Sequence, residues 1–124
     1  MGERTIVLKM KNGADVLEEI RKAVEGNGIE YGLFVSGCGK IRDVELVSSE
    51  PKGGMSRTKF AGECDLNAIS GKVQKRRGSL DLNVRVSVCG RGFTPRAGQL
   101  VGGKAAEVLE IGIRNVDLNK IIGA

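Results

Sequence analysis

The sequence contains no histidine and no tryptophan, and only 3% of its 124 residues are aromatic. The absence of histidine excludes Ser-His-Asp and Cys-His catalysis, together with every histidine-ligated zinc site. Three Phe and one Tyr disfavour the aromatic surfaces on which RRM and OB folds stack single-stranded nucleic acid. We therefore expect an aliphatic core and no site that depends on imidazole chemistry or base stacking.

Cysteine is also scarce, and its arrangement favours reduced thiols. Cys38, Cys64 and Cys89 are odd in number and widely spaced, and no two have the spacing of metal ligands. The apolar runs extend over only a few residues, and no signal-peptide core precedes the first strand-like segment. These features predict a cytoplasmic protein that does not cross a membrane.

Length and periodicity predict one domain over residues 1–124 with a single clear helix. The composition, 40% hydrophobic and 28% charged, is that of an ordinary globular protein with its own core. Residues 5–10 are rich in β-branched side chains and predict a strand. Residues 12–25 follow a helical period, with Asn12 expected as the N-cap and Gly26-Asn27-Gly28 expected to end the helix.

The rest of the chain has the pattern of β structure. Two strands are expected over residues 31–36 and 43–48, separated by a turn at Gly37-Cys38-Gly39, where glycine supplies positive φ. Residues 90–98 predict a loop. Residues 105–122 leave helix and strand both open, because a helix-favouring start is followed by β-branched residues.

The middle of the chain predicts a long hairpin. Two strands or one bent strand are expected over residues 59–75, with a break near Gly62 or Gly71. Residues 76–79 predict a turn, and residues 80–88 show the clearest alternation of apolar and polar side chains. These features indicate a sheet with one buried face.

Positive charge is concentrated in one stretch. Residues 72–104 hold eight Lys and Arg and one acid, Asp81, although the net charge of the whole chain is only +5. A local excess of this size indicates where an anionic partner would bind. A solvated turn is the plainer interpretation of its turn and loop residues, but they are also the candidates for contact with nucleic-acid phosphates: Lys75, Arg76, Arg77, Arg91 and Arg96.

A row of polar side chains follows the alternating segment. Asp81, Asn83 and Arg85 are expected on one strand face, which is usually the solvated face of a half-buried sheet. Because Asp81 is the one acid in this basic stretch, it is a candidate for an ion pair with Arg85 or Lys104. The row is therefore either a solvated surface or part of a site.

Several short segments, taken in order, resemble one family. A strand at Arg4-Thr5-Ile6-Val7-Leu8 and a helix after Gly13-Ala14-Asp15 are followed by Ser36-Gly37-Cys38-Gly39, Gly62 to Gly71, the alternating strand and Leu100-Val101-Gly102-Gly103. Their order and spacing resemble the PPC domain, the plants-and-prokaryotes conserved module found beside AT-hooks in plant nuclear proteins and alone in bacteria and archaea. The resemblance covers nearly the whole chain.

The resemblance implies a fold and an assembly. The fold is α+β, a curved and mostly antiparallel β-sheet packed with one main N-terminal helix, and the assembly is a homotrimer. It also implies a segment used in self-association and partner binding, with a Gly-Arg-Phe-Glu-Ile-Leu-like pattern. Glu63 and Cys64 replace the Arg and Phe of that pattern in this chain, where the segment comprises Gly62, Glu63, Cys64, Asp65 and Leu66.

Many prokaryotic members of this family resemble metal proteins, with a His-x-His strand and a histidine after the Gly-Gly pair. Asp81, Asn83 and Lys104 occupy these positions here, and they form a poor set of transition-metal ligands because a protonated lysine cannot coordinate. We therefore expect no metal and no cofactor. The positional match also implies that Asp81, Asn83, Arg85 and Lys104 converge in a pocket.

These observations lead to competing functional hypotheses. The leading one is a non-enzymatic, DNA-associated or regulatory homotrimer that binds phosphates weakly through its basic turns. The alternative is a pocket, catalytic or not, for a small phosphate or carboxylate metabolite, built from Asp81, Asn83, Arg85, Gly102, Gly103 and Lys104. A third and plainer option is a structural trimer that binds protein partners through residues 62–71.

Overall fold

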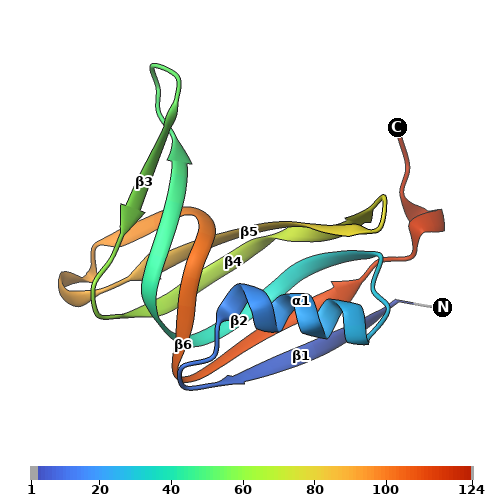
Figure 1. The fold of residues 1–124 in the computed structure, drawn as a ribbon, viewed down its shortest axis with the longest axis horizontal. Coiled ribbons are helices and arrows are strands. Elements are labelled where there is room, and N and C mark those ends of the chain that lie inside the picture. The colour runs from blue at the N-terminus through green and yellow to red at the C-terminus, as the bar shows by residue number, and fades with distance from the viewer. Residues whose placement is uncertain (1–2, 124) are drawn as a thin grey trace.

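A computed structural model describes residues 3–123, except for the side chain of Arg91. The described chain forms one α-helix and a six-stranded antiparallel sheet (Figure 1), which confirms the predicted α+β class. In chain order the elements are β1 (Arg4–Lys11), α1 (Val16–Gly26), β2 (Tyr31–Ser49), β3 (Met55–Lys59), β4 (Glu63–Arg76), β5 (Ser79–Cys89), the 3-10 helix η1 (Arg91–Phe93), β6 (Pro95–Asn115) and the 3-10 helix η2 (Leu118–Lys120).

The sheet closes on itself through its longest strand. Its strand order is β1-β6-β5-β4-β2-β3, and β6 also pairs with β2. The first residues of β6, Pro95 to Gln99, pair with β5, whereas the rest of β6 pairs with β2 and, near its end, with β1. Strands β2, β4, β5 and β6 thus form a ring of hydrogen-bonded neighbours, with β1 and β3 outside it.

Strand β2 runs without interruption from Tyr31 to Ser49, so the predicted turn at Gly37-Cys38-Gly39 is wrong. The register between β2 and β6 shifts between Gly39 and Lys40, which bends the strand instead of ending it. Gly39 has φ +127°, and a Cβ at this position would overlap the carbonyl oxygen of Val108. Glycine is needed there because the strands approach closely, not because the chain reverses.

The ambiguous C-terminal region is a strand as far as Asn115. Ile111 and Ile113 are fully buried because this part of β6 lies between β1 and β2, where the apolar side chains face the core. The predicted loop over residues 90–98 is shorter than expected, since β6 already begins at Pro95. The predicted break near Gly62 is confirmed, because it falls between β3 and β4.

Helix α1 begins one turn later than the sequence suggests. Its N-cap is Asp15, whose side chain accepts a hydrogen bond from the backbone N of Glu18 at 3.1 Å, so the prediction of Asn12 is wrong. Asn12 Oδ1 instead accepts from the backbone N of Glu107 at 3.2 Å. The chain still follows β6 at this point, because Gly13 donates its N–H to that strand. The helix can start only after these contacts end.

The core lies between α1 and the sheet and is almost entirely aliphatic. Helix α1 buries Val16, Ile20 and Val24 against one face of the sheet, where Phe34 is the single buried aromatic residue among those described. No helix within residues 3–123 is long and apolar enough to span a membrane.

The sheet face opposite α1 carries exposed apolar side chains. Ile6, Leu8 and Met10 of β1 pack on the core, so Val7 points to the other side, where it is 61% exposed. A Cβ on Gly112, the register partner of Val7, would lie 3.5 Å from Val35. This apolar face is therefore available to another molecule.

Candidate functional site

The basic turn joins β4 to β5 in a tight hairpin. Arg76 and Ser79 are the last paired residues, and the Ser79 hydroxyl donates to the carbonyl oxygen of Arg76 at 3.2 Å. The two residues between them, Arg77 and Gly78, have φ of +50° and +82°. Two positive φ values are typical of the type I′ turn, which matches the twist of the flanking strands. The turn therefore holds its basic side chains at the end of the ribbon.

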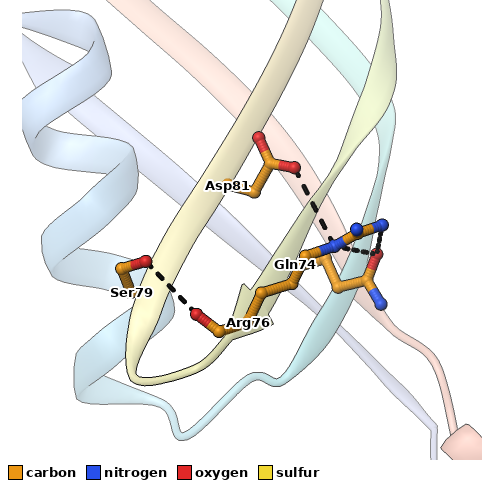
Figure 2. Close-up of polar contacts among 4 residues, drawn as sticks. All are labelled: Gln74, Arg76, Ser79 and Asp81. Atoms are coloured by element: carbon orange, nitrogen blue, oxygen red, sulfur yellow. Dashed lines mark hydrogen bonds and ion pairs between the residues drawn. The ribbon is translucent and has the colours of Figure 1, made fainter.

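The side chain of Arg76 is held along the ribbon (Figure 2). Its Nε and Nη2 donate to Gln74 Oε1 at 3.3 and 3.0 Å, and its Nε lies 4.0 Å from Asp81 Oδ2. The ion-pair partner of Asp81 is thus Arg76. The sequence predicted Arg85 or Lys104 in this role, and neither forms the pair. Both side chains are more than half exposed, so this ion pair contributes little to stability.

Lys75 and Arg77 are exposed, and within the described residues their side chains make no hydrogen bond or ion pair. A phosphate group could therefore approach them without breaking existing contacts. The turn thus offers two free cations and a third, Arg76, that is partly neutralised by Asp81.

Arg96 lies far from this turn. It is at the start of β6, with its guanidinium carbon 5.9 Å from the ring centroid of Phe60. Arg91 belongs to η1 at the same end of β5, and its side chain lies outside the described residues. Strand β5 has 11 residues and spans about 35 Å. A single chain therefore does not bring the five predicted phosphate-binding residues into one patch.

The polar row on β5 does not meet Lys104 within one chain. Arg85 pairs with Gln99 on β6, but further along β6 the neighbour has become β2, and Lys104 pairs with Arg42 there. The beginning of β5 and Lys104 also lie at opposite ends of α1, because Leu80 lines a hollow with Val24 whereas Lys104 pairs with Asp15.

Gly102 and Gly103 are part of β6, and their immediate environment is one of packing. A Cβ on Gly103 would lie 3.1 Å from the side chain of Ile41, and Gly102 pairs with Glu45. The absence of a side chain at Gly103 therefore leaves space for the side chain of Ile41 in the core. Lys104 follows directly and is exposed.

Arg42, the cross-strand partner of Lys104, was missed by reasoning from the sequence. Arg42 lies in a segment that holds both basic and acidic residues, so its charge does not stand out in the sequence. Only the strand register places it beside Lys104. The signal was therefore absent from the sequence pattern and depends on tertiary structure.

The first three residues of the predicted partner segment, Gly62, Glu63 and Cys64, line a hollow in the described surface. This hollow of about 710 Å³ is formed by Phe60, Gly62, Glu63, Cys64 and Arg96 with their neighbours. The Cys64 side chain is buried, and burial raises the pKa of its thiol, with the nearby Cys89 and Asp65 adding to the effect. Cys64 is thus held as a neutral packing residue, with no property of an activated nucleophile.

The family's metal positions do not form a metal site here. Asp81 is turned toward Arg76, Lys104 lies on another part of the sheet, and the described residues hold no group of three or more His, Cys, Asp or Glu that could bind a metal ion. These residues therefore do not fit the metal site that the family resemblance implies.

The fold defines an α+β protein in which one N-terminal helix covers a bent antiparallel sheet. Residues 1–117 match the model of the Plants and Prokaryotes Conserved (PCC) domain, and the chain belongs to this family. This is the family that the sequence segments resemble. No curated protein matches the chain.

Solved structures share the whole fold at low sequence identity. A PPC protein from Pyrococcus horikoshii has a TM-score of 0.81 at 23% identity, over 92% of this chain and 79% of that chain. A putative DNA-binding protein from Bacteroides thetaiotaomicron has a TM-score of 0.81 at 16% identity, over 90% and 78% of the two chains. A metal-containing protein from Archaeoglobus fulgidus has a TM-score of 0.80 at 16% identity, over 92% and 80%. At these identities the similarity shows the fold alone.

Proposed function

We propose that the chain forms a cytoplasmic homotrimer that binds the phosphate backbone of DNA weakly, without catalysing a reaction. The observation that carries this proposal is the β4–β5 turn, where Lys75 and Arg77 are exposed and have no partner among the described residues. Family membership supports it, since relatives with the same fold include a putative DNA-binding protein.

The chemistry of the turn favours the backbone of DNA over its bases. Cations on an exposed tip release counterions when they bind phosphates, and such contacts carry no sequence information. No aromatic side chain is present at residues 75–79 to stack on a base. We therefore expect binding that weakens steeply with salt and differs little between DNA sequences.

The trimer is proposed because the apolar face opposite α1 needs a partner. Val7 and Val35 are 61% and 48% exposed, and burying such side chains in an interface is favourable by about 25 cal/mol per Å² of apolar surface. A second and third copy of the chain are the proposed occupants. Sedimentation equilibrium should give three times the mass of one chain, and a monomer at micromolar concentration would contradict this part of the proposal.

DNA titration tests the other part. We expect a fluorescent duplex to bind at low salt, with an affinity that falls linearly on a double-logarithmic plot against salt concentration. The variant Arg77→Gln should reduce the slope by about one for each turn in contact. Lys52→Gln, which removes one exposed charge in the β2–β3 turn, is the matched control. Absence of binding at low salt, or an equal loss in both variants, would refute the proposed use of the turn.

A further inference from the structure

We propose that Arg42 and Lys104 form a binding site for a small oxyanion, a ligand that presents a phosphate or carboxylate group. The site lies on β2 and β6, away from the β4–β5 turn, and does not depend on the proposed binding of DNA. In this site Lys104 acts together with Arg42, because within one chain Lys104 does not meet the polar row of β5.

Four charged residues lie in one row, three of them on neighbouring strands and Asp15 on the segment that leads into α1. Asp15 pairs with Lys104, Lys104 with Arg42, and Arg42 with Glu63. Directly opposed residues in antiparallel strands have Cβ atoms about 5 Å apart on the same face of the sheet. Two cations therefore stand side by side in the middle of the row, with one carboxylate at each end.

The carboxylates at the ends of the row do not neutralise the two cations. Asp15 accepts the N-cap hydrogen bond from Glu18, and among the described residues neither Lys104 nor Arg42 makes an ion pair. The acids in the first turn of α1 are also engaged, since Glu18 and Glu19 each lie 3.8 Å from a basic side chain of the helix, Arg21 and Lys22.

The guanidinium of Arg42 is turned away from Glu63 and across β6. Its Nη2 lies 3.5 Å from the position that a Cβ on Gly13 would occupy, beside the loop that precedes α1. Its Nε is buried, and that donor has no hydrogen-bond partner. A buried donor without an acceptor is costly in a folded protein and calls for an explanation, such as a ligand.

An oxyanion would neutralise the two unpaired cations and also accept a hydrogen bond from the buried Nε of Arg42. A guanidinium offers its Nε and one terminal nitrogen as parallel donors that match two oxygens of a carboxylate or phosphate, and a lysine adds a point charge. The repulsion between like charges directly opposite each other would also be relieved. Because the Nε is buried, only a small acceptor can reach it, which favours a small ligand over the backbone of a duplex.

Calorimetric titration with inorganic phosphate and with succinate, at constant ionic strength, tests the proposal. We expect saturable binding of at least one of the two, weakened about tenfold by Lys104→Gln because one charge-assisted contact is lost. Arg42→Lys keeps the charge but removes the Nε donor, and it should weaken binding to a similar degree. Lys52→Gln removes the same charge from a distant turn and should leave the affinity unchanged.

Three results would overturn the proposal: no saturable binding of either anion, binding that survives both site variants, or an equal loss in Lys52→Gln. A short DNA duplex supplies the remaining comparison. If the duplex displaces the bound anion and its own affinity falls in Lys104→Gln, the pair belongs to a nucleic-acid surface and the small-ligand site is wrong. Melting temperatures without anion show whether each variant is folded, so that a loss of binding is not mistaken for unfolding.

Discussion

The basic turn at residues 75–77 and the Arg42–Lys104 pair are both positive, but they differ in their place in the fold, in the sequence separation of their residues and in their exposure. The turn lies at the tip of the β4–β5 ribbon, its residues are neighbours in sequence, and its side chains project into solvent. The pair joins residues far apart in sequence, lies within the sheet and includes a buried donor without an acceptor.

This difference decides which anion each region suits. Exposed cations on a turn can follow a long, repeating polyanion and bind it with little specificity. Two cations fixed by strand register, one with a buried N–H, can instead select a single group by its geometry. The stretch from 72 to 104 therefore contributes to two regions with different chemistry, with Lys75, Arg76 and Arg77 in one and Lys104 in the other.

Two glycines separate backbone effects from binding effects. Gly13 and Gly78 have φ of +90° and +82°, but a Cβ would meet Arg42 only at Gly13, since nothing lies within 4 Å at Gly78. We expect either change to Ala to lower the free energy of unfolding by about 1–2 kcal/mol, because both force a left-handed backbone on alanine. Urea unfolding measures this effect.

Phosphate affinity then distinguishes the two variants. Gly13→Ala should weaken phosphate binding severalfold, because the new methyl group contacts the guanidinium of Arg42. Gly78→Ala should leave it unchanged. Equal phosphate affinities in the two variants would mean that the position of Arg42 against Gly13 does not matter for the site.

A smaller effect is expected when strain at the turn is relieved. Arg77 has φ +50°, which costs about 1 kcal/mol for a residue with a Cβ, whereas glycine loses about 0.5 kcal/mol more chain entropy on folding. Arg77→Gly should therefore raise the free energy of unfolding by about 0.5 kcal/mol while weakening DNA binding. A variant that is less stable than the wild type would show that Arg77 makes a stabilising contact.

The smallest effect is expected when the paired cations are separated without a ligand. Lys104→Gln removes a like-charge contact with Arg42, so in anion-free buffer it should raise the free energy of unfolding by a few tenths of a kcal/mol. Added phosphate should reverse the order, because only the wild type binds it tightly. Urea unfolding with and without phosphate measures both; a variant that is the more stable in each buffer would argue against the site.

The sequence predicted much of the fold because local patterns decide it. The single helix, the turn at residues 76–79 and the alternation along β5 all follow from periodicity and turn residues. The predicted turn at Gly37-Cys38-Gly39 failed because the two glycines allow close packing, Gly37 against side chains of β4 and Gly39 against the backbone of β6, which no local pattern reveals. The N-cap was misplaced for the same reason, since Asn12 is occupied by Glu107.

The candidate site was predictable only where it is local. Adjacent bases such as Arg76 and Arg77 are visible in the sequence, but the partners of Asp81 and Lys104 depend on strand register. The family resemblance suggested a pocket that includes Lys104 and Asn83, whereas the register within one chain places Arg42 beside Lys104. Charge density along a chain thus locates exposed sites, and register is needed to find sites within a sheet.

The most direct test of the division into two regions is NMR of the arginine Nε–H resonances during two titrations. With inorganic phosphate, we predict that the Arg42 signal shifts and that the Arg76 and Arg77 signals stay in place. With a DNA duplex at low salt, the prediction is reversed: Arg77 shifts and Arg42 does not. If both ligands shift the same arginines, the positive charge acts as one surface and the account is contradicted.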